Sequence, residues 1–245
     1  MKFFFYFGEY LLMLRNTFSK PEQRAIYFRR IFDESQAIGV ESLGIVAIVS
    51  VFIGAVTTIN TSYQLVSSWI PDSVIGQIVS DSTILELSPT IASLVLAGKI
   101  GSNIATEIGT MRVSEQIDAL EVMGVNSAGY LVLPKIIAAL FMLPALIVIS
   151  MFLSILGGYL VGMYAGIVSP DHFLSGAQST FKIFTFEFAM IKTVTFAFLI
   201  ASVSSYQGYY ADGGSIEVGR ASTRAVVYSS VLILLFDFLL AKLFL

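Results

Sequence analysis

The sequence is short of the residues that make metal sites and disulfide bonds, and it is short of charge. It contains no cysteine and one histidine, and 13% of its 245 residues are charged, whereas 56% are hydrophobic. Without cysteine, disulfide bonds and thiolate metal sites are excluded. His172 lies near Pro170 and Asp171, and we expect it in a loop. The composition is not that of a soluble domain, and we expect neither a metal site nor a nucleic-acid partner.

Nucleotide-binding and hydrolytic motifs are also missing. The segment "LAGKIG" has Gly-Lys but lacks the upstream Gly and the following Ser or Thr of the phosphate-binding loop. Neither H-E-x-x-H nor G-x-S-x-G occurs, which argues against an intramembrane enzyme. We therefore expect a chain that is not an enzyme and that receives energy, if it uses any, from another chain.

What the sequence has in abundance is long apolar runs. A helix needs about 20 apolar residues to cross the hydrocarbon of a bilayer, and five runs reach that length. We expect an all-α membrane protein with spans at about 43–66, 84–107, within 136–168, 183–206 and 225–244. The third run is too long for one upright helix and too short for two spans with a loop. It is either one tilted helix kinked at Pro144 or a helix with a re-entrant segment.

The distribution of Lys and Arg favours one tilted helix for the third run. With five spans, most of the basic residues fall on one side, which the positive-inside rule assigns to the cytoplasm. Only Lys182 and Lys242 approach the other side. The N-terminus is then cytoplasmic and the C-terminus external. The residues on the cytoplasmic side or at its boundary are Lys2, Arg15, Lys20, Arg24, Arg29, Arg30, Arg112, Lys135, Arg220 and Arg224.

Residues 1–35 differ in pattern from residues 36–245, which form the five-span domain. The first segment is rich in aromatic residues and then in arginines beside apolar residues. Such a pattern is typical of amphipathic helices that lie in the membrane interface. Glu9 interrupts the first apolar stretch, so we do not expect a cleavable signal.

Glycines in the third run predict close helix packing. Gly158, Gly162 and Gly166 recur every four residues and share one face of a helix. Small residues at that spacing let another backbone approach.

A compact charged stretch separates the second and third spans. Ser114 is expected to cap a short helix at about residues 115–123, which Gly124 ends. At about 100° per residue, apolar and acidic side chains separate onto two faces. The apolar residues are Val113, Ile117, Leu120 and Met123, and the acids are Glu115, Asp118 and Glu121. We expect this helix to dock into a basic groove of a soluble partner, since an anionic leaflet would repel the acids.

Three ionisable residues fall inside the apolar spans, namely Glu86, Lys192 and Asp237. A charge at the bilayer centre costs roughly 2.5–3.5 kcal/mol on insertion scales, so these side chains are expected to face a cavity or one another. Three interpretations remain open: a polar pocket for a substrate, a structural ion pair, or the relay of an ion-coupled secondary transporter. The last usually shows an internal repeat and broken helices, and no convincing repeat is present.

Three stretches together resemble the MlaE-type permeases, the membrane subunits of bacterial ABC transporters that move phospholipid between the inner and outer membranes. They are "AGKIGSNIATEIGTMRVSEQIDALEVMGVNSAGYLVLPKIIA" (97–138), "IKTVTFAFLIASVSSYQGYYADGGSIEVGRASTRAVVYSSVLILLFDFLLAKL" (191–243) and "QAIGVESLGIVAIVSVFIGAV" (36–56). The resemblance implies a homodimer in the bacterial inner membrane that supports outer-membrane lipid asymmetry. It also implies a partner ATPase, which holds ATP and Mg, and a periplasmic MCE-domain protein.

The resemblance also implies roles for particular residues. The family's coupling helix, which fits into the ATPase, matches Arg112, Glu115, Gln116, Asp118, Leu120, Glu121 and Met123. A Gly and Arg segment before the last span matches Gly213, Gly214, Gly219, Arg220, Thr223 and Arg224.

A lipid pathway is implied along the outer halves of the spans. It would comprise Val56, Ile59, Asn60, Leu65, Glu86, Leu87, Ile91, Lys192 and Asp237. The chain departs from many relatives at Leu85, where they carry Arg, and at Asn60, where they carry Gln. The headgroup preference therefore stays open.

Overall fold

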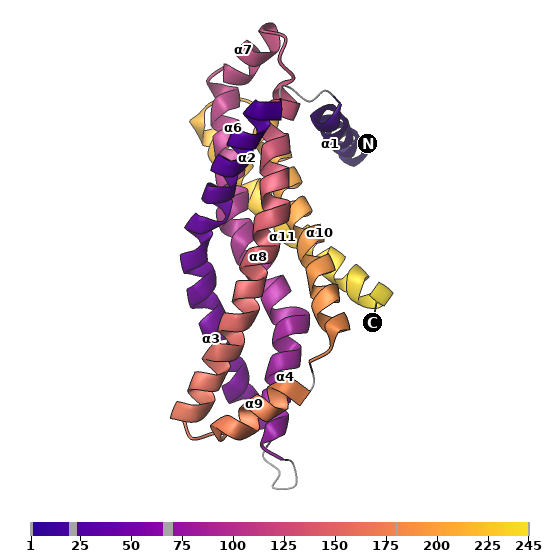
Figure 1. Cartoon of the computed structure of the whole chain (residues 1–245). Coiled ribbons are helices and arrows are strands. Elements are labelled where there is room, and N and C mark those ends of the chain that lie inside the picture. The colour runs from indigo at the N-terminus through magenta and orange to yellow at the C-terminus, as the bar shows by residue number, and fades with distance from the viewer. Residues whose placement is uncertain (1, 20–23, 66–70, 180, 245) are drawn as a thin grey trace. The chain divides into compact units, whose positions relative to one another are not determined.

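The structure is a computed structural model that describes residues 2–19, 24–65, 71–179 and 181–244, and the described residues form helices with no strand. The helices, drawn in Figure 1, divide into two compact units by their contacts. Unit one comprises Met1–Glu41, Leu96–Leu143 and Thr195–Phe236, and unit two comprises Ser42–Val95, Pro144–Val194 and Asp237–Leu245. The long helices α8 (Ser127–Tyr164), α10 (Ile183–Tyr209) and α11 (Ser215–Phe244) each contribute to both units.

Unit one contains α1 (Lys2–Phe18), α2 (Arg24–Ile38), α6 (Ser102–Val113) and α7 (Gln116–Val122). α6 and α10 approach closely at Gly208, where a Cβ would lie 2.7 Å from the carbonyl oxygen of Ala105. Ile108, Ile117 and Phe196 are fully buried in this unit. Helix contact thus depends on small residues at the crossing and on branched or aromatic residues beside it.

Unit two contains α3 (Leu43–Gln64), α4 (Ser73–Ser82), the π-helical segment η2 (Thr83–Ile91), α5 (Ala92–Leu96) and α9 (Pro170–Ser179). α3 and α8 pack backbone to backbone, because a Cβ on Gly54 would collide with the backbone of Ser154 and one on Gly157 with that of Val51. A hydrogen bond of 2.7 Å joins the buried hydroxyls of Ser50 and Ser150.

The expectation of an all-α protein with five spans is confirmed. Five helical stretches are long and apolar enough to cross a membrane: Tyr27–Gln64, Ser73–Val113, Ser127–Tyr164, Ile183–Tyr209 and Ser215–Phe244. The third run forms the single helix α8 with Pro144 inside it, as the basic-residue distribution favoured. At about 1.5 Å per residue α8 is roughly 57 Å long, which leaves room for tilt. Val66, the expected end of the first span, lies outside the described residues.

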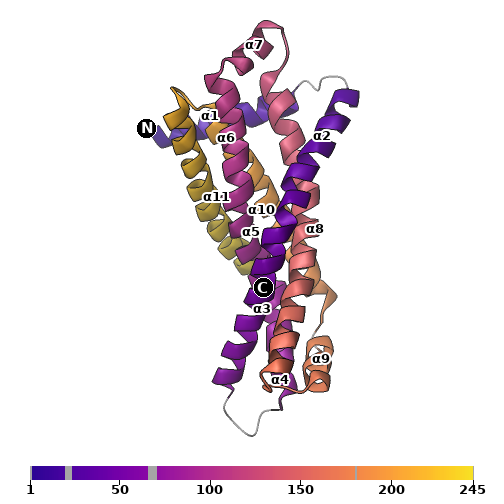
Figure 2. The ribbon, with the colours of Figure 1, turned by 90° about the vertical axis from the view of Figure 1, so that its left-hand side faces the viewer.

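The second span begins earlier than its sequence suggested. Residues 73–82, expected in a loop, form α4, which packs against α9 (Figures 1 and 2). The two helices are in close contact because Gly76 faces the backbone of Phe173 and Gly176 faces that of Ser73. His172, also expected in a loop, lies exposed in α9. Two π-helical segments, η2 and η3 (Ala97–Gly101), interrupt the second span, and η2 contains Pro89.

The three glycines expected on one packing face separate into two groups. Gly158 faces Thr58 and the backbone of Gly54, and Gly162 faces Thr58 and Phe173. The expectation that Gly166 shares this packing face is wrong, because α8 ends at Tyr164 and Gly166 lies in the following turn with φ +64°. At this position glycine is favoured because the backbone is left-handed, and not because another helix approaches.

The N-terminal helices pack against the rest of unit one. In α1, Met13 is buried, and the hydroxyls of Tyr10 and Ser202 are 2.8 Å apart. Burial raises the pKa of Tyr10, and its hydrogen bond with Ser202 offsets part of that shift. In α2, the Arg30 guanidinium lies 3.7 Å from the centre of the Tyr130 ring. Through η1 (Val40–Ser42), α2 leads into α3.

Candidate functional sites

Lys192 is the centre of an ion cluster in unit two. Its side chain on α10 is fully buried, and its Nζ lies 2.6 Å from Glu86 Oε2 and 2.7 Å from Asp237 Oδ1. The cluster contains two carboxylates for one ammonium. The structure thus brings together the three ionisable residues that the sequence placed in separate spans.

The local structure around Glu86 explains how the cluster forms. Glu86 lies on η2, where π-helical hydrogen bonding changes the register of the side chains along the span. Thr90 Oγ1 is 3.5 Å from Glu86 Oε1, and the Lys192 Nζ is 5.0 Å from the centre of the Phe188 ring. The side chain of Glu86 is 45% exposed, whereas that of Lys192 is 0% exposed. Glu86 is therefore the member of the cluster that a ligand can reach.

The other residues assigned to the lipid pathway differ in how far their side chains are exposed. Val56, Ile59 and Asn60 lie on the exposed side of α3, and Leu87 and Ile91 on η2 are partly exposed. Leu65 instead packs against the buried cluster formed by Ile75, Val79, Val168 and Phe173.

The charged stretch between the second and third spans forms α7, which extends beyond α6 (Figure 2). The helix begins at Gln116, one residue later than expected, because Glu115 has a left-handed conformation with φ 60°. Ser114 does not cap α7, since its hydroxyl donates to the Thr110 carbonyl of α6 at 2.7 Å. The expectation that Gly124 ends the helix is confirmed by its φ of 78° and by the bond from Val125 N to Leu120 O.

The side chains on the two faces of α7 make contacts that the periodicity of the sequence predicts only in part. Ile117 is buried and Leu120 is half-buried, as the periodicity predicted. Asp118 pairs with Arg112 at 2.7 Å, and Glu121 accepts hydrogen bonds within the chain. Val122 and Met123 are 89% and 68% exposed at the tip of the helix. The C-terminal end of α7 thus presents exposed apolar side chains.

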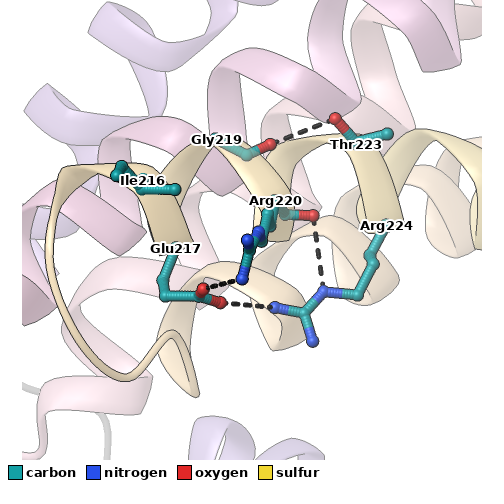
Figure 3. A pocket seen from close by; sticks show the side chains of 6 residues that line it. All are labelled: Ile216, Glu217, Gly219, Arg220, Thr223 and Arg224. Atoms are coloured by element: carbon teal, nitrogen blue, oxygen red, sulfur yellow. Dashed lines mark hydrogen bonds and ion pairs between the residues drawn. The ribbon is translucent and has the colours of Figure 1, made fainter.

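The Gly and Arg segment begins in the loop before α11 and continues into its first turns. Arg220 and Arg224 both pair with Glu217, and Thr223 donates to the Gly219 carbonyl at 3.1 Å (Figure 3). Ile216, Glu217, Gly219, Arg220, Thr223 and Arg224 line an open pocket on this helix. Gly213, with φ 117°, provides the turn that precedes the helix, and Gly214 lies exposed beside it.

Comparison with known proteins identifies the family. A family model described as Permease MlaE matches residues 31–243, which leave out α1 and the first turns of α2. The chain belongs to the MlaE permease family.

Individual relatives agree with this MlaE assignment. A probable ABC transporter permease protein of Rickettsia bellii is 40% identical over 227 residues, covering 89% of this chain and 84% of the relative. The intermembrane phospholipid transport system permease protein MlaE of Haemophilus influenzae is 30% identical over 223 residues, covering 90% and 84%. The chloroplastic protein TRIGALACTOSYLDIACYLGLYCEROL 1 of Arabidopsis thaliana is 33% identical over 219 residues, covering 89% and 62%.

This MlaE-family chain has a second buried lysine cluster that sequence reasoning missed. In unit one, Lys135 is 1% exposed, and its Nζ lies 2.5 Å from Glu34 Oε1 and 2.7 Å from Glu107 Oε2. These ion pairs join α8 to α2 and α6. The sequence places Lys135 on the cytoplasmic side or at its boundary, and the spacing along the chain gives no sign of its partners on two distant segments.

Proposed function

We propose that this protein is the permease subunit of an ATP-driven ABC transporter that moves phospholipid between the inner and outer membranes of a bacterium. The observation that carries the proposal is the MlaE family match along residues 31–243. The name of the Haemophilus relative, an intermembrane phospholipid transport system permease protein, supports the substrate class.

Two copies of the chain form the lipid pathway in this proposal. α11 supports it, because one side of the helix is apolar and exposed and needs lipid or a protein neighbour in the membrane. The residues on that side that are at least half exposed include Val227, Val231, Leu234, Leu235 and Phe238. A periplasmic MCE-domain protein receives or delivers the lipid at the outer side.

The ATPase docks at α7 on the cytoplasmic side, with the N-terminus inside and the C-terminus in the periplasm. ATP and Mg are bound by that partner and not by this chain. Met123 and Val122 supply apolar contact area, and the exposed acids Glu115 and Asp118 contribute charge around it. Such an arrangement matches a protein interface with an apolar centre and a polar rim.

The lipid headgroup binds beside the Lys192 cluster in this proposal. Two carboxylates and one ammonium leave a surplus negative charge, which favours a headgroup carrying a positive group over one carrying a further negative charge. Glu86 is the accessible acid, and the neighbouring apolar side chains of Leu87, Ile91, Val56 and Ile59 accommodate acyl chains.

The test is the phospholipid content of the complex purified with its ATPase. Lys192→Ala is expected to reduce the bound phospholipid measured by mass spectrometry, because it disperses the acids that define the headgroup site. Lys182→Ala, at an exposed lysine just before α10, is the matched control and is expected to retain wild-type lipid. A wild-type amount of bound phospholipid in Lys192→Ala would show that this cluster has only a structural role.

An ion-coupled secondary transporter is the second candidate, and the convergence of Glu86, Lys192 and Asp237 is the observation in its favour. A secondary transporter would move its substrate under an ion gradient without any ATPase subunit. A reconstitution without any ATPase therefore separates the two candidates.

A further inference from the structure

Glu121 makes contacts unlike those of the other acids on the coupling segment. Its Oε1 accepts hydrogen bonds from Ser127 Oγ at 2.8 Å and from Tyr209 OH at 3.0 Å. The two hydroxyls are also 2.7 Å apart. One carboxylate oxygen thus connects α7 to the first residue of α8 and the last residue of α10.

The pair Arg112–Asp118 provides a useful contrast. It joins α7 only to the adjacent α6, and its side chains are 35% and 52% exposed. An exposed ion pair of this kind contributes little to stability. The hydrogen bond from Tyr209 to Glu121 instead comes from a residue 88 positions away along the chain, and the second donor, Ser127, is only 3% exposed. Hydrogen bonds to an ionised acceptor are also stronger than neutral ones.

A run of tyrosines continues from Tyr209 toward α1. The ring centres of Tyr209 and Tyr210 are 5.3 Å apart, those of Tyr210 and Tyr206 are 5.1 Å apart, and those of Tyr206 and Tyr10 are 5.7 Å apart. Tyr206 also donates to Glu9 Oε2 at 3.2 Å. The C-terminal end of α10 is therefore in contact with both α7 and the N-terminal helix α1.

We propose that Glu121, Ser127 and Tyr209 form a latch through which a displacement of α7 moves the ends of α8 and α10. Glu121 is then a positioning residue, and the ATPase contacts the neighbouring exposed Val122 and Met123. This inference rests on the proposed docking of an ATPase at α7. α10 also carries Lys192, so the helix that receives the motion carries a residue of the proposed lipid site.

The experiment uses the complete transporter complex reconstituted in liposomes. Glu121→Ala is expected to lower the phospholipid moved per ATP hydrolysed by about tenfold, the size of losing a hydrogen bond to a charged group. The KM for ATP and the amount of ATPase that co-purifies stay at wild-type values. Glu121→Gln, which keeps an acceptor oxygen without the charge, gives an intermediate loss.

Tyr209→Phe tests whether the effect acts through the latch. It is expected to reduce coupling in the same direction, and the double variant Glu121→Ala with Tyr209→Phe is expected to be no worse than Glu121→Ala alone, because residues of one network are not additive. Asp212→Asn and Tyr228→Phe are matched controls at exposed positions and keep wild-type coupling.

Several results would overturn the latch. Loss of the ATPase from Glu121→Ala would make Glu121 a docking residue, and a fall in melting temperature matching the loss of activity would make it only structural. Unchanged coupling, or additive effects in the double variant, would also contradict it. A failure of the proposed function is distinguishable, because it would appear in the wild-type complex as absent ATP-driven lipid movement.

Discussion

The two units of this protein each contain a buried lysine between two carboxylates, but the surroundings of the two clusters differ. Lys135 joins α2, α6 and α8 in unit one, the unit that carries α7. Lys192 joins η2, α10 and α11 in unit two, beside the exposed apolar side chains of the proposed lipid pathway. Similar ion clusters can therefore hold helices together at one place and, in the proposed function, form a binding site at another.

Removing either lysine is expected to have the largest effect on stability. Lys135→Met and Lys192→Met each leave two carboxylates facing each other without their counter-ion, which costs about 3–5 kcal/mol when a buried pair is broken. Thermal unfolding in detergent should show a lower melting temperature for both, and Lys182→Met is the control. A wild-type melting temperature for either variant would show that its cluster carries no stabilising role.

Neutral replacement of each whole cluster separates the two roles. Lys135→Met with Glu34→Gln and Glu107→Gln is expected to regain both stability and transport, since a buried ion cluster can be replaced without loss of stability. Lys192→Met with Glu86→Gln and Asp237→Asn is expected to regain stability but not lipid binding. If both triple variants regained transport equally, the two clusters would not differ in role.

The glycine contacts of unit two predict a smaller effect. Gly54→Ala forces a methyl group into the backbone of Ser154, and such overpacking typically costs about 1–3 kcal/mol. Gly44→Ala on the same helix α3 places the new Cβ more than 4 Å from the neighbouring atoms that the structure describes, and it is expected to leave the melting temperature unchanged or raise it. Equal destabilisation by both substitutions would contradict the close packing of α3 on α8.

The smallest expected effect concerns the tip of α7 in unit one. Val122→Ser with Met123→Ser removes exposed apolar area, so the folded permease is unaffected while ATPase binding weakens by about 1–2 kcal/mol. Asp118→Asn is expected to change binding less, because Asp118 is already paired with Arg112. Binding titrations with purified ATPase measure both. A greater loss from Asp118→Asn would favour docking through the acidic face.

The sequence predicted the spans and the unusual residues, because runs of apolar residues and charges within them are local signals. It correctly favoured one helix for the run containing Pro144 and placed a short helix before Gly124. It did not predict α4 and α9 packed through Gly76 and Gly176, since polar residues there resemble a loop.

The sequence predicted that the three ionisable residues within its spans would face a cavity or one another, which the ion pairs of Lys192 confirm, but it could not predict the atoms that pair. Glu86, Lys192 and Asp237 lie on three separate helical segments, and Glu86 belongs to the π-helical segment η2. The partners of Lys135 and the bond between Glu121 and Tyr209 could not be predicted for the same reason, because they come from distant segments. Side-chain contacts of this kind are set by helix packing and not by periodicity within one helix.

ATP-driven transfer of phospholipid by the reconstituted complex tests the central claim most directly. Liposomes that contain the permease and its co-purified ATPase, with labelled phospholipid and an acceptor, are compared with and without ATP and with the ATPase omitted. We predict transfer that requires both ATP and the ATPase. Transfer by the permease alone under an ion gradient, with no response to ATP, would contradict the account.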